Sequence, residues 1–252
     1  MGAMTLTLHG TGAGTPSGHR MASALSARFG DGGVVLFDAG EGCSRAMIRD
    51  GIDINRITTV AISHMHADHW CGLPGLVTGW SALKRGAGEI EIFVPVGRVP
   101  FLERALIESL HFDDMVEFRL RFGELDAFEM QEGWRVETFT TTHLARVEEH
   151  ARAHGAADRA LGYVLRNGPR RVVLSQDIGR ATDLSGVIDG AELVVCESAH
   201  AEPGEILAMA REAGVRRLIF THVSPGREGS FSERFDGIEW SVARDGDSVV
   251  VA

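Results

Sequence analysis

Three histidines and one aspartate lie within six consecutive positions of the segment SHMHADHWCGL. They are His64, His66, Asp68 and His69, directly after an apolar run and directly before a Gly/Pro-rich stretch. Imidazole and carboxylate are the ligands of zinc and of metals with similar preferences. Four such groups in so short a segment suit two metal ions, provided that other segments complete each coordination shell. A polar loop whose histidines only form hydrogen bonds is the weaker interpretation of this spacing.

Three further metal-capable residues follow other apolar runs. His143 ends the segment WRVETFTTTH, Asp177 ends RRVVLSQD, and His222 lies at the end of RRLIFTHV. Because α/β folds build their sites at the carboxyl ends of strands, we expect these side chains close to residues 64–69. Each of them alone could be a polar residue of a turn. Three of them at strand ends are what the first cluster requires.

Short β-type segments recur along the chain, and several of them alternate polar and apolar residues. Strands are predicted at residues 5–10, 24–29, 34–40, 58–64, 89–96, 116–122, 134–143, 161–166, 170–177, 192–198 and 216–223, with a closing pair around residues 245–246. Helices are predicted in CSRAMIRD, VPFLERALIESL and PGEILAMAREAG, where proline or glycine marks an end. We predict a single α/β domain over residues 1–252, of which residues 1–3 could be a cloning scar before a natural start at Met4.

Composition and charge exclude several classes of protein. The 252 residues are 44% apolar and 24% charged, which is typical of a globular chain, and no apolar run approaches the roughly 20 residues that span a bilayer. The net charge is −10 and the 25 basic residues are scattered, so we do not expect a nucleic-acid or membrane partner. Three cysteines without a CxxC pair, and no secretory signal at the N-terminus, predict a cytoplasmic protein.

The cluster and its flanking stretches resemble the metallo-β-lactamase fold. The segment from residue 64 to residue 69 has the form HxHxDH, and GTGAGTP, LFDAGEG, LGYVL, SQDIG and FTHVSP occur in the order of the ribonuclease Z-like branch. The resemblance covers nearly the whole chain. It implies a four-layer αββα sandwich of the metallo-β-lactamase type, a homodimer, and two zinc ions, or manganese or iron, in a cleft at one edge.

The resemblance also implies a set of metal ligands. By matching positions, the first zinc would be held by His64, His66 and His143, the second by Asp68, His69 and His222, and Asp177 would bridge the two. Such a site implies a hydrolase that uses a metal-bridging hydroxide, which Asp68 could orient or deprotonate. Asp38 resembles a carboxylate that holds a ligand histidine by a hydrogen bond, with a simple turn carboxylate as the alternative.

A proton donor for the leaving group is predicted in the segment CESAH. The ribonuclease Z-like branch carries a His-Glu pair in this region, followed by a second histidine. Here Glu197 matches the glutamate and His200 the second histidine, while Cys196 stands where the first histidine usually is. We therefore predict Asp68, Glu197 and His200 as catalytic residues, although this loop is shorter than the family pattern.

One departure from the family bears on the substrate. Ribonuclease Z enzymes carry a long Gly- and Lys-rich arm that clamps tRNA, inserted between the GY strand and the bridging aspartate. Here Asn167-Gly168-Pro169 forms a tight turn that leaves no room for an arm. We therefore expect a phosphodiesterase that acts on a small anionic molecule, such as a cyclic nucleotide or cyclic ribose phosphate, and no RNA partner. The alternatives are a hydrolase of carboxylic, thio- or sulfate esters, a ribonuclease Z-type tRNA 3′ endonuclease, and a non-catalytic metal-binding sensor.

Extra residues occur instead at 144–160, directly after His143. The segment is rich in charged and small residues, and His150 and His154 stand four positions apart, so they could share one face of a helix. A third metal site and a lid over the substrate are both compatible with this spacing. A helix with a solvated charged face is the simpler interpretation.

Overall fold

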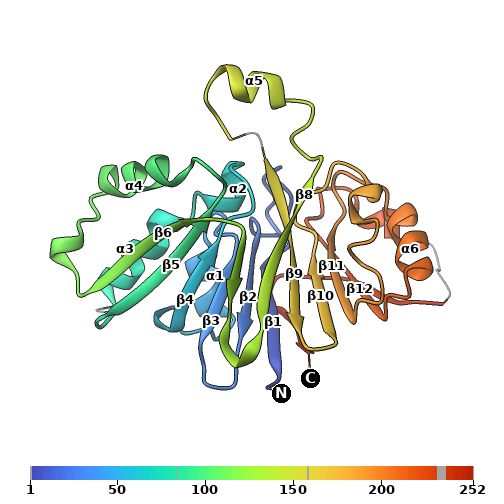
Figure 1. Cartoon of the computed structure of the whole chain (residues 1–252), viewed down its shortest axis with the longest axis horizontal. Coiled ribbons are helices and arrows are strands. Elements are labelled where there is room, and N and C mark those ends of the chain that lie inside the picture. Colours follow the sequence, from blue (N-terminus) through green and yellow to red (C-terminus); the bar gives the residue numbers. More distant parts are fainter. Residues whose placement is uncertain (1, 84, 158, 232–236, 252) are drawn as a thin grey trace.

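Two seven-stranded sheets lie face to face in the computed structural model, which describes residues 2–83, 85–157, 159–231 and 237–251 (Figure 1). The first sheet, in spatial order, consists of β14 (Asp247–Val251), β1 (Met4–Gly10), β2 (Ala24–Arg28), β3 (Val34–Phe37), β4 (Ile57–Ala61), β5 (Gly88–Val94) and β6 (Phe118–Glu124). The second consists of β13 (Glu239–Val242), β12 (Arg217–Thr221), β11 (Leu193–Glu197), β10 (Arg170–Leu174), β9 (Ala160–Asn167), β8 (Arg135–Thr141) and β7 (Ala127–Glu129).

Helices cover the outer faces of both sheets. The α-helices are α1 (Cys43–Arg49), α2 (Ala67–Trp70), α3 (Leu73–Ala82), α4 (Val99–Glu108), α5 (Glu148–Ala153) and α6 (Pro203–Glu212). The 3₁₀ helices are η1 (Ile54–Arg56), η2 (Asp113–Met115), η3 (Gln131–Gly133), η4 (Ala181–Leu184) and η5 (Glu228–Phe231). Helices α1, α3 and α4 lie on the first sheet and α6 on the second, so the predicted four-layer sandwich is confirmed (Figure 1).

Alternation along β1 illustrates how the central layer forms. Met4, Leu6 and Leu8 point between the two sheets, where they join a cluster of buried apolar side chains from both. His9 points to the other side, and its Nδ1 lies 2.7 Å from a carboxylate oxygen of Asp50 at the end of α1. Each buried leucine contributes about 1.5–3 kcal/mol to folding, so this two-residue period fixes the orientation of the strand.

Several elements differ from the expectation. Helix α3 was not predicted, because its glycines and Pro74 resemble a break, yet the proline occupies the first turn, where its missing N–H costs nothing. Strand β7 was not predicted either. The expected closing strand pair is wrong: β13 pairs parallel with β12, whereas β14 pairs antiparallel with β1, so the two belong to different sheets. The residue pattern of a strand does not tell which partner it joins.

Strand direction brings the predicted site residues to one edge of the sandwich. β3 runs parallel to β4, and β10, β11 and β12 run parallel to one another, so their carboxyl ends lie together in each sheet. β8 is antiparallel to β9, which is antiparallel to β10, so β8 also ends at this edge. The strands end at Ala61, Thr141 and Leu174, two or three residues before the ligand that each was expected to carry. His64, His143 and Asp177 therefore lie in loops that follow these strands.

The helices are short. The longest of them, α3, α4 and α6, have ten residues each. None of the helices in the described ranges combines the length and the apolar character needed to cross a membrane. The single domain and the cytoplasmic location remain predictions.

The loop after β3 packs backbone against backbone with the turn between α2 and α3. Ala39 N donates to the carbonyl oxygen of His69 at 2.7 Å, and Gly72 N donates to the carbonyl oxygen of Ala39 at 2.8 Å. A side chain does not fit at Gly72, because a Cβ there would overlap the carbonyl oxygen of Gly40. This close approach holds the two loops together at the edge that carries the site.

Substituting this glycine should destabilise the fold. Gly72→Ala forces the two loops apart, and we expect the free energy of unfolding, measured by urea denaturation, to fall by about 1–3 kcal/mol. Gly75→Ala is the matched control, because a Cβ at that position in α3 meets nothing within 4 Å. Alanine favours a helix, so Gly75→Ala should raise the free energy of unfolding by about 0.5–1 kcal/mol. Equal effects of the two substitutions would contradict the close approach.

Candidate metal centre

The seven predicted metal ligands lie together at the carboxyl edge of the sandwich. In chain order they are His64 and His66 after β4, Asp68 and His69 in α2, His143 after β8, Asp177 after β10, and His222 directly after β12. Their ligand atoms form two groups in which all atoms lie within 4.8 Å of one another. One group contains the first two histidines, His143 and Asp177, and the other contains Asp68, His69 and His222.

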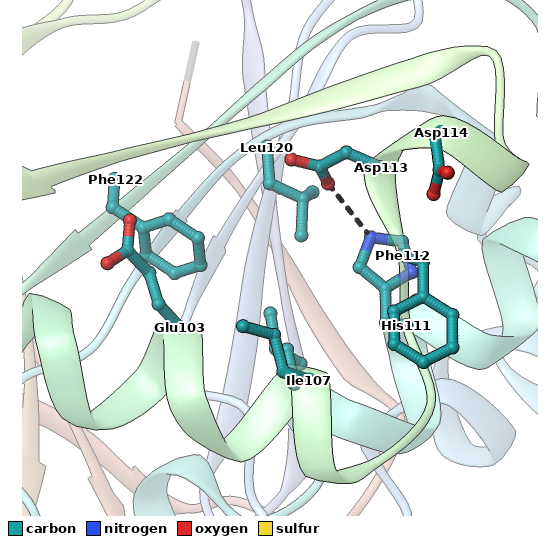
Figure 2. A pocket seen from close by; sticks show the side chains of 9 residues that line it. Glu103, Ile107, His111, Phe112, Asp113, Asp114, Leu120 and Phe122 are labelled. Atoms are coloured by element: carbon teal, nitrogen blue, oxygen red, sulfur yellow. Dashed lines mark ion pairs between the residues drawn. The ribbon is translucent and has the colours of Figure 1, made fainter.

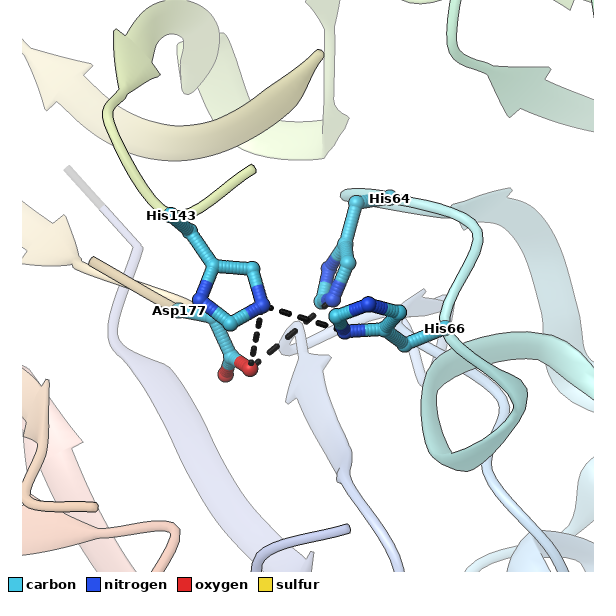
Figure 3. Close-up of side chains that lie close together, drawn as sticks. All are labelled: His64, His66, His143 and Asp177. Atoms are coloured by element: carbon cyan, nitrogen blue, oxygen red, sulfur yellow. Dashed lines mark hydrogen bonds and ion pairs between the residues drawn. The ribbon is translucent and has the colours of Figure 1, made fainter. Parts of the chain in front are cut away.

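Asp177 stands between the two groups. Its Oδ2 lies 3.4 Å from His143 Nε2 and 3.8 Å from His64 Nε2. Its Oδ1 lies 3.4 Å from His69 Nε2 and 3.3 Å from His222 Nε2. Figure 3 shows the first group, in which the imidazole rings and the carboxylate point toward a common centre. The two oxygens of one carboxylate thus face two separate sets of imidazoles, as expected of a bridging ligand.

Asp68 completes the second group. Its Oδ2 lies 3.4 Å from His69 Nε2 and 3.9 Å from His222 Nε2. It is the partly exposed member of this group, because the two histidines are buried and Asp68 is half-buried. Its free side faces the residues of the GTGAGTP loop, of which Gly14 comes close enough that a Cβ would touch the carboxylate. Asp68 therefore combines contact with the second group and access from the cleft.

The donor atoms fit a divalent cation. Among the buried side-chain atoms of the described residues that have no hydrogen-bond partner, three belong to the seven predicted ligands: His64 Nε2, His69 Nε2 and Asp177 Oδ1. Leaving a buried polar atom unsatisfied costs about 1–3 kcal/mol, so three of them in one place call for a ligand. Donor atoms at about 2.0–2.1 Å from a tetrahedral zinc lie about 3.4 Å from one another, and the separations around Asp177 are close to this value. The donor atoms and their spacing therefore suit a divalent metal.

Burial also sets the protonation of these groups. Burial, reinforced by the neighbouring His69, lowers the pKa of His64 well below its usual value, and burial lowers the pKa of His143 to about 4. Burial opposes the ionisation of Asp177, but His222 and His69 outweigh it and hold the pKa of the carboxyl well below its usual range. His64 and His143 thus favour the neutral imidazole and Asp177 the ionised carboxylate, which are the forms that bind cations. His69 differs, because burial opposes its protonation but Asp177 and Asp38 outweigh it and raise its pKa well above the usual value.

Asp38 and Ser63 orient two of the histidines. Asp38 Oδ2 lies 2.5 Å from His69 Nδ1, which leaves Nε2 of that ring for the cluster. Ser63 N donates to Asp38 Oδ1 at 2.7 Å, and Ser63 Oγ lies 3.1 Å from His64 Nδ1. The buried Asp38 is therefore the histidine-holding carboxylate and not a simple turn residue. Ser63 was not identified from the sequence, although its position directly before His64 was the available signal.

Asp183 was also missed, and it joins the loops that carry His143 and Asp177. Its Oδ2 accepts hydrogen bonds from Thr142 N at 2.8 Å and from Gly179 N at 2.9 Å. Its side chain is only 4% exposed, and its bond with Thr142 is partly buried. This joining role depends on Thr142, which is 41 positions away in the sequence, and on Gly179, which is 4 positions away. The sequence around Asp183 carries no signal for it.

Backbone strain is concentrated around the cluster. Five described residues other than glycine have a positive φ, and three of them are at the site: Asp38 at 58°, Gln176 at 47° and His222 at 53°. Such conformations cost of order 1–3 kcal/mol each and persist only where the surroundings impose them. The hydrogen bonds of Asp38 and the tight loops after β10 and β12 impose them here. The fold thus gives up stability to aim these side chains.

His200 and Glu197 lie at the rim of the cluster. His200 Nδ1 is 3.4 Å from Glu197 Oε1 and 3.9 Å from Asp177 Oδ2. Glu197 is buried, and its Oε2 accepts hydrogen bonds from Ala199 N at 2.5 Å and His200 N at 3.0 Å. The hydrogen bond with Glu197 raises the pKa of His200. The shorter loop therefore still brings His200 to the predicted place, while Cys196 is buried in the layer beneath α6.

A separate hollow of about 480 Å³ lies between α4 and β6 (Figure 2). Ile107, Phe112 and Phe122 supply apolar walls, and His111 Nε2 lies 3.6 Å from Asp113 Oδ1. None of its lining residues belongs to a metal-capable group of the described residues. The chemistry is therefore at the carboxyl edge and not in this hollow.

Comparison with known proteins supports this view of the cluster. A family model described as the beta-lactamase superfamily domain matches residues 34–223. The ribonuclease Z of Methanosarcina acetivorans is 28% identical over 277 residues, a match that covers 88% of this chain and 88% of the relative. The crystal structure of the short form of human tRNase Z has a TM-score of 0.77 at 24% identity and covers 97% of this chain and 98% of its own.

A second solved structure, the metallo-beta-lactamase fold protein YhfI of Bacillus subtilis, has a TM-score of 0.76 at 16% identity and covers 99% of this chain and 100% of its own. At identities below 25%, these two structures support the fold only. Together with the family model and the Methanosarcina relative, they confirm the resemblance to the metallo-β-lactamase fold and its ribonuclease Z-like branch.

The relatives correct the predicted substrate. The expectation of a small-molecule substrate and of no RNA partner is wrong, because the matched relatives are ribonucleases by name. The net charge was a poor guide to the substrate, because it averages over the whole surface and does not give the potential at any one site. The tight turn between β9 and β10 is present, with Asn167 opposite Arg170 in the ladder. The homodimer and the identity of the metal remain predictions.

Weakening the support of His69 should weaken metal binding. In Asp38→Asn the carboxylate that holds His69 Nδ1 is replaced by a neutral amide, and we expect the affinity for Zn²⁺ to fall about 10- to 100-fold. Competition with a fluorescent chelator measures this affinity. Asp53→Asn is the control, because Asp53 accepts only a local hydrogen bond at the start of η1. Unchanged affinity in Asp38→Asn would contradict the orienting role.

Proposed function

Since the chain belongs to the beta-lactamase superfamily, we propose that it is an endoribonuclease of the ribonuclease Z type, which hydrolyses phosphodiester bonds of RNA with two bound divalent ions. That the chain is a hydrolase follows from its family. One observation carries the rest: the two oxygens of Asp177 face two separate groups of imidazoles. That arrangement suits a pair of cations that share one carboxylate. A non-catalytic sensor would not need it.

The two proposed metal ions are zinc, and the seven ligands in the two groups described above would hold them. Ions bound there would lower the pKa of a water and neutralise charge on the phosphate oxygens. Manganese and iron accept the same nitrogen and oxygen ligands, so the supply of metal also decides which ion is bound. The ligand set carries no cysteine, which favours this range of metals over softer ones.

Two residues of the chain are proposed to move the protons of the reaction. Water attacks the phosphorus, a P–O bond to a ribose oxygen breaks, and the leaving oxygen takes up a proton. Asp68 Oδ2, at the open side of the cluster, accepts the proton of the attacking water. His200 donates a proton to the leaving oxygen, since its contact with Glu197 raises its pKa and favours the protonated imidazolium. Glu197 acts as a positioning residue through His200.

Local charge supports an RNA substrate in spite of the acidic chain. A hollow of about 450 Å³ beside Asp68 is lined by Arg20 and Arg45. A neighbouring hollow of about 460 Å³ shares Arg20 and is lined also by Arg49 and Arg244. Arg20 and Arg45 thus lie beside Asp68 at the open side of the cluster, together with Glu41, and a phosphate of an RNA strand could lie there. Because the β9–β10 turn is tight, contacts near the cleft must replace those of an arm.

The first test is cleavage of a precursor tRNA that carries a 3′ extension. The zinc-loaded protein should cut it, and Asp177→Asn should lower the rate at least about 100-fold, because both groups lose their shared ligand. Asp189→Asn, an exposed carboxylate away from the cluster, is the control and should keep the wild-type rate. Hydrolysis of bis(p-nitrophenyl) phosphate without any cleavage of RNA would keep the hydrolase and refute the RNA substrate.

The role of His200 is tested by the leaving group. His200→Gln should lower kcat about 10²- to 10⁴-fold for RNA, whose leaving ribose oxygen needs a proton. Nitrophenolate leaves without a proton, so the same variant should lose far less activity on bis(p-nitrophenyl) phosphate. Equal losses on the two substrates would show that His200 acts on the metal centre and not as the proton donor.

A further inference from the structure

The segment 144–157 leaves the sandwich between β8 and β9 and stands over the edge that carries the metal centre (Figure 1). The ladder closes beneath it, because Thr141 pairs with Ala160. At its far end the carbonyl oxygen of Gly155 accepts a hydrogen bond from Arg98 Nη1 at 2.7 Å. Arg98 lies at the start of α4, so the segment is fixed at both sides of the cleft.

The short helix α5 in this segment has two different faces. Val147, His150, Ala151 and His154 recur at helical spacing and line one hollow. Glu148 and Arg152 form an ion pair on the remaining surface and do not line that hollow. The charged residues thus face water, as the simpler expectation held, while the other face of the helix is turned to the cleft.

The hollow has a volume of about 330 Å³ and opens beside the metal centre. His66, which belongs to the first metal-capable group, is also one of its lining residues. Its other walls are Met65, Leu144 and the α5 residues named above, with Ala156 and Ala157. Among the described residues that line it there is no lysine, arginine or carboxylate. Its lining is therefore apolar with flat imidazole rings.

This chemistry selects a nucleobase over the other parts of a substrate. A phosphate would find no cation in the hollow, and a ribose would find few hydrogen-bond partners. A base offers a flat apolar face that stacks on imidazole rings and edges that accept or donate hydrogen bonds to them. In RNA, one ribose separates each phosphate from its nearest base. His66 belongs both to the metal centre, where the phosphate would bind, and to the lining of the hollow, where the base would bind. His150 and His154 join no metal-capable group of the described residues, which argues against a third metal.

We propose that the segment 144–157 forms a nucleobase pocket, which holds the base of the nucleotide next to the phosphate at the metal centre. The proposal rests on the phosphodiester chemistry proposed above and names the part of the substrate that this chain recognises. Val147 and the two histidines of the segment form one wall of the pocket, and Met65 with His66 forms the other.

Equilibrium binding to the zinc-loaded protein tests the pocket without any cleavage. By calorimetry, adenosine 5′-monophosphate should bind about ten-fold more tightly than ribose 5-phosphate, which has the same phosphate and no base. Val147→Asp puts a carboxylate into the hollow, and Ala151→Phe fills it. Each should reduce this ratio to about one. Glu149→Ala, on the same helix but outside the hollow, is the matched control and should keep the ten-fold ratio.

Two outcomes would overturn the pocket: equal affinities of the two ligands for the wild-type protein, or a ten-fold ratio that survives both substitutions. A ten-fold ratio that Val147→Asp abolishes supports the pocket even if the protein cuts no RNA, in which case only the proposed function fails. Where RNA is cut, an abasic nucleotide on one side of the scissile bond should lower kcat/KM about ten-fold for the wild type and not for Val147→Asp, because the two changes remove the same contact.

Discussion

The structure depends on a single carboxylate that two sets of imidazoles share. Asp177 has no room to turn, since its oxygens face histidines on both sides and its loop is held by Asp183. Without a cation, this arrangement would leave buried nitrogen and oxygen atoms without hydrogen-bond partners, which destabilises the fold. Such atoms are expected where a ligand binds. The loops around it accept positive φ angles at Asp38 and His222 for the same reason. At this edge the fold is less stable than it could be, because its backbone and buried polar groups are arranged to position the ligands.

The two sheets contribute unequal parts of the centre. The first sheet supplies the dense segment after β4 and its supports, Asp38 and Ser63, which form one hydrogen-bonded unit. The second sheet supplies single ligands from separate loops, each positioned by its own strand. The central apolar layer between the sheets is therefore what holds the two halves of the site in register. Loss of packing between the sheets would separate the ligands before it unfolded either sheet.

Sequence alone was sufficient for much of this description. The ligand types and their spacing predicted which seven residues would meet, because strand ends in this class of fold share an edge. The roles of Ser63 and Asp183 were not predicted, because they arise from contacts between loops, which leave no periodic pattern in the sequence. The closing strands were misassigned because a strand pattern does not specify its partner. The substrate was misjudged because a net charge carries no position, and the arginines beside Asp68 became visible only in the folded chain.

The rung between Thr141 and Ala160 closes the sheet below α5, so the helix and its flanks form a self-contained excursion. Among the described residues of that excursion, His143 at its base is the one that belongs to the metal cluster. Residues beyond Leu144 can therefore vary in length and composition without disturbing the bond-breaking machinery. If the proposed pocket is correct, substrate selection and hydrolysis reside in separable parts of one polypeptide, so that evolution or an engineer could exchange the first while keeping the second.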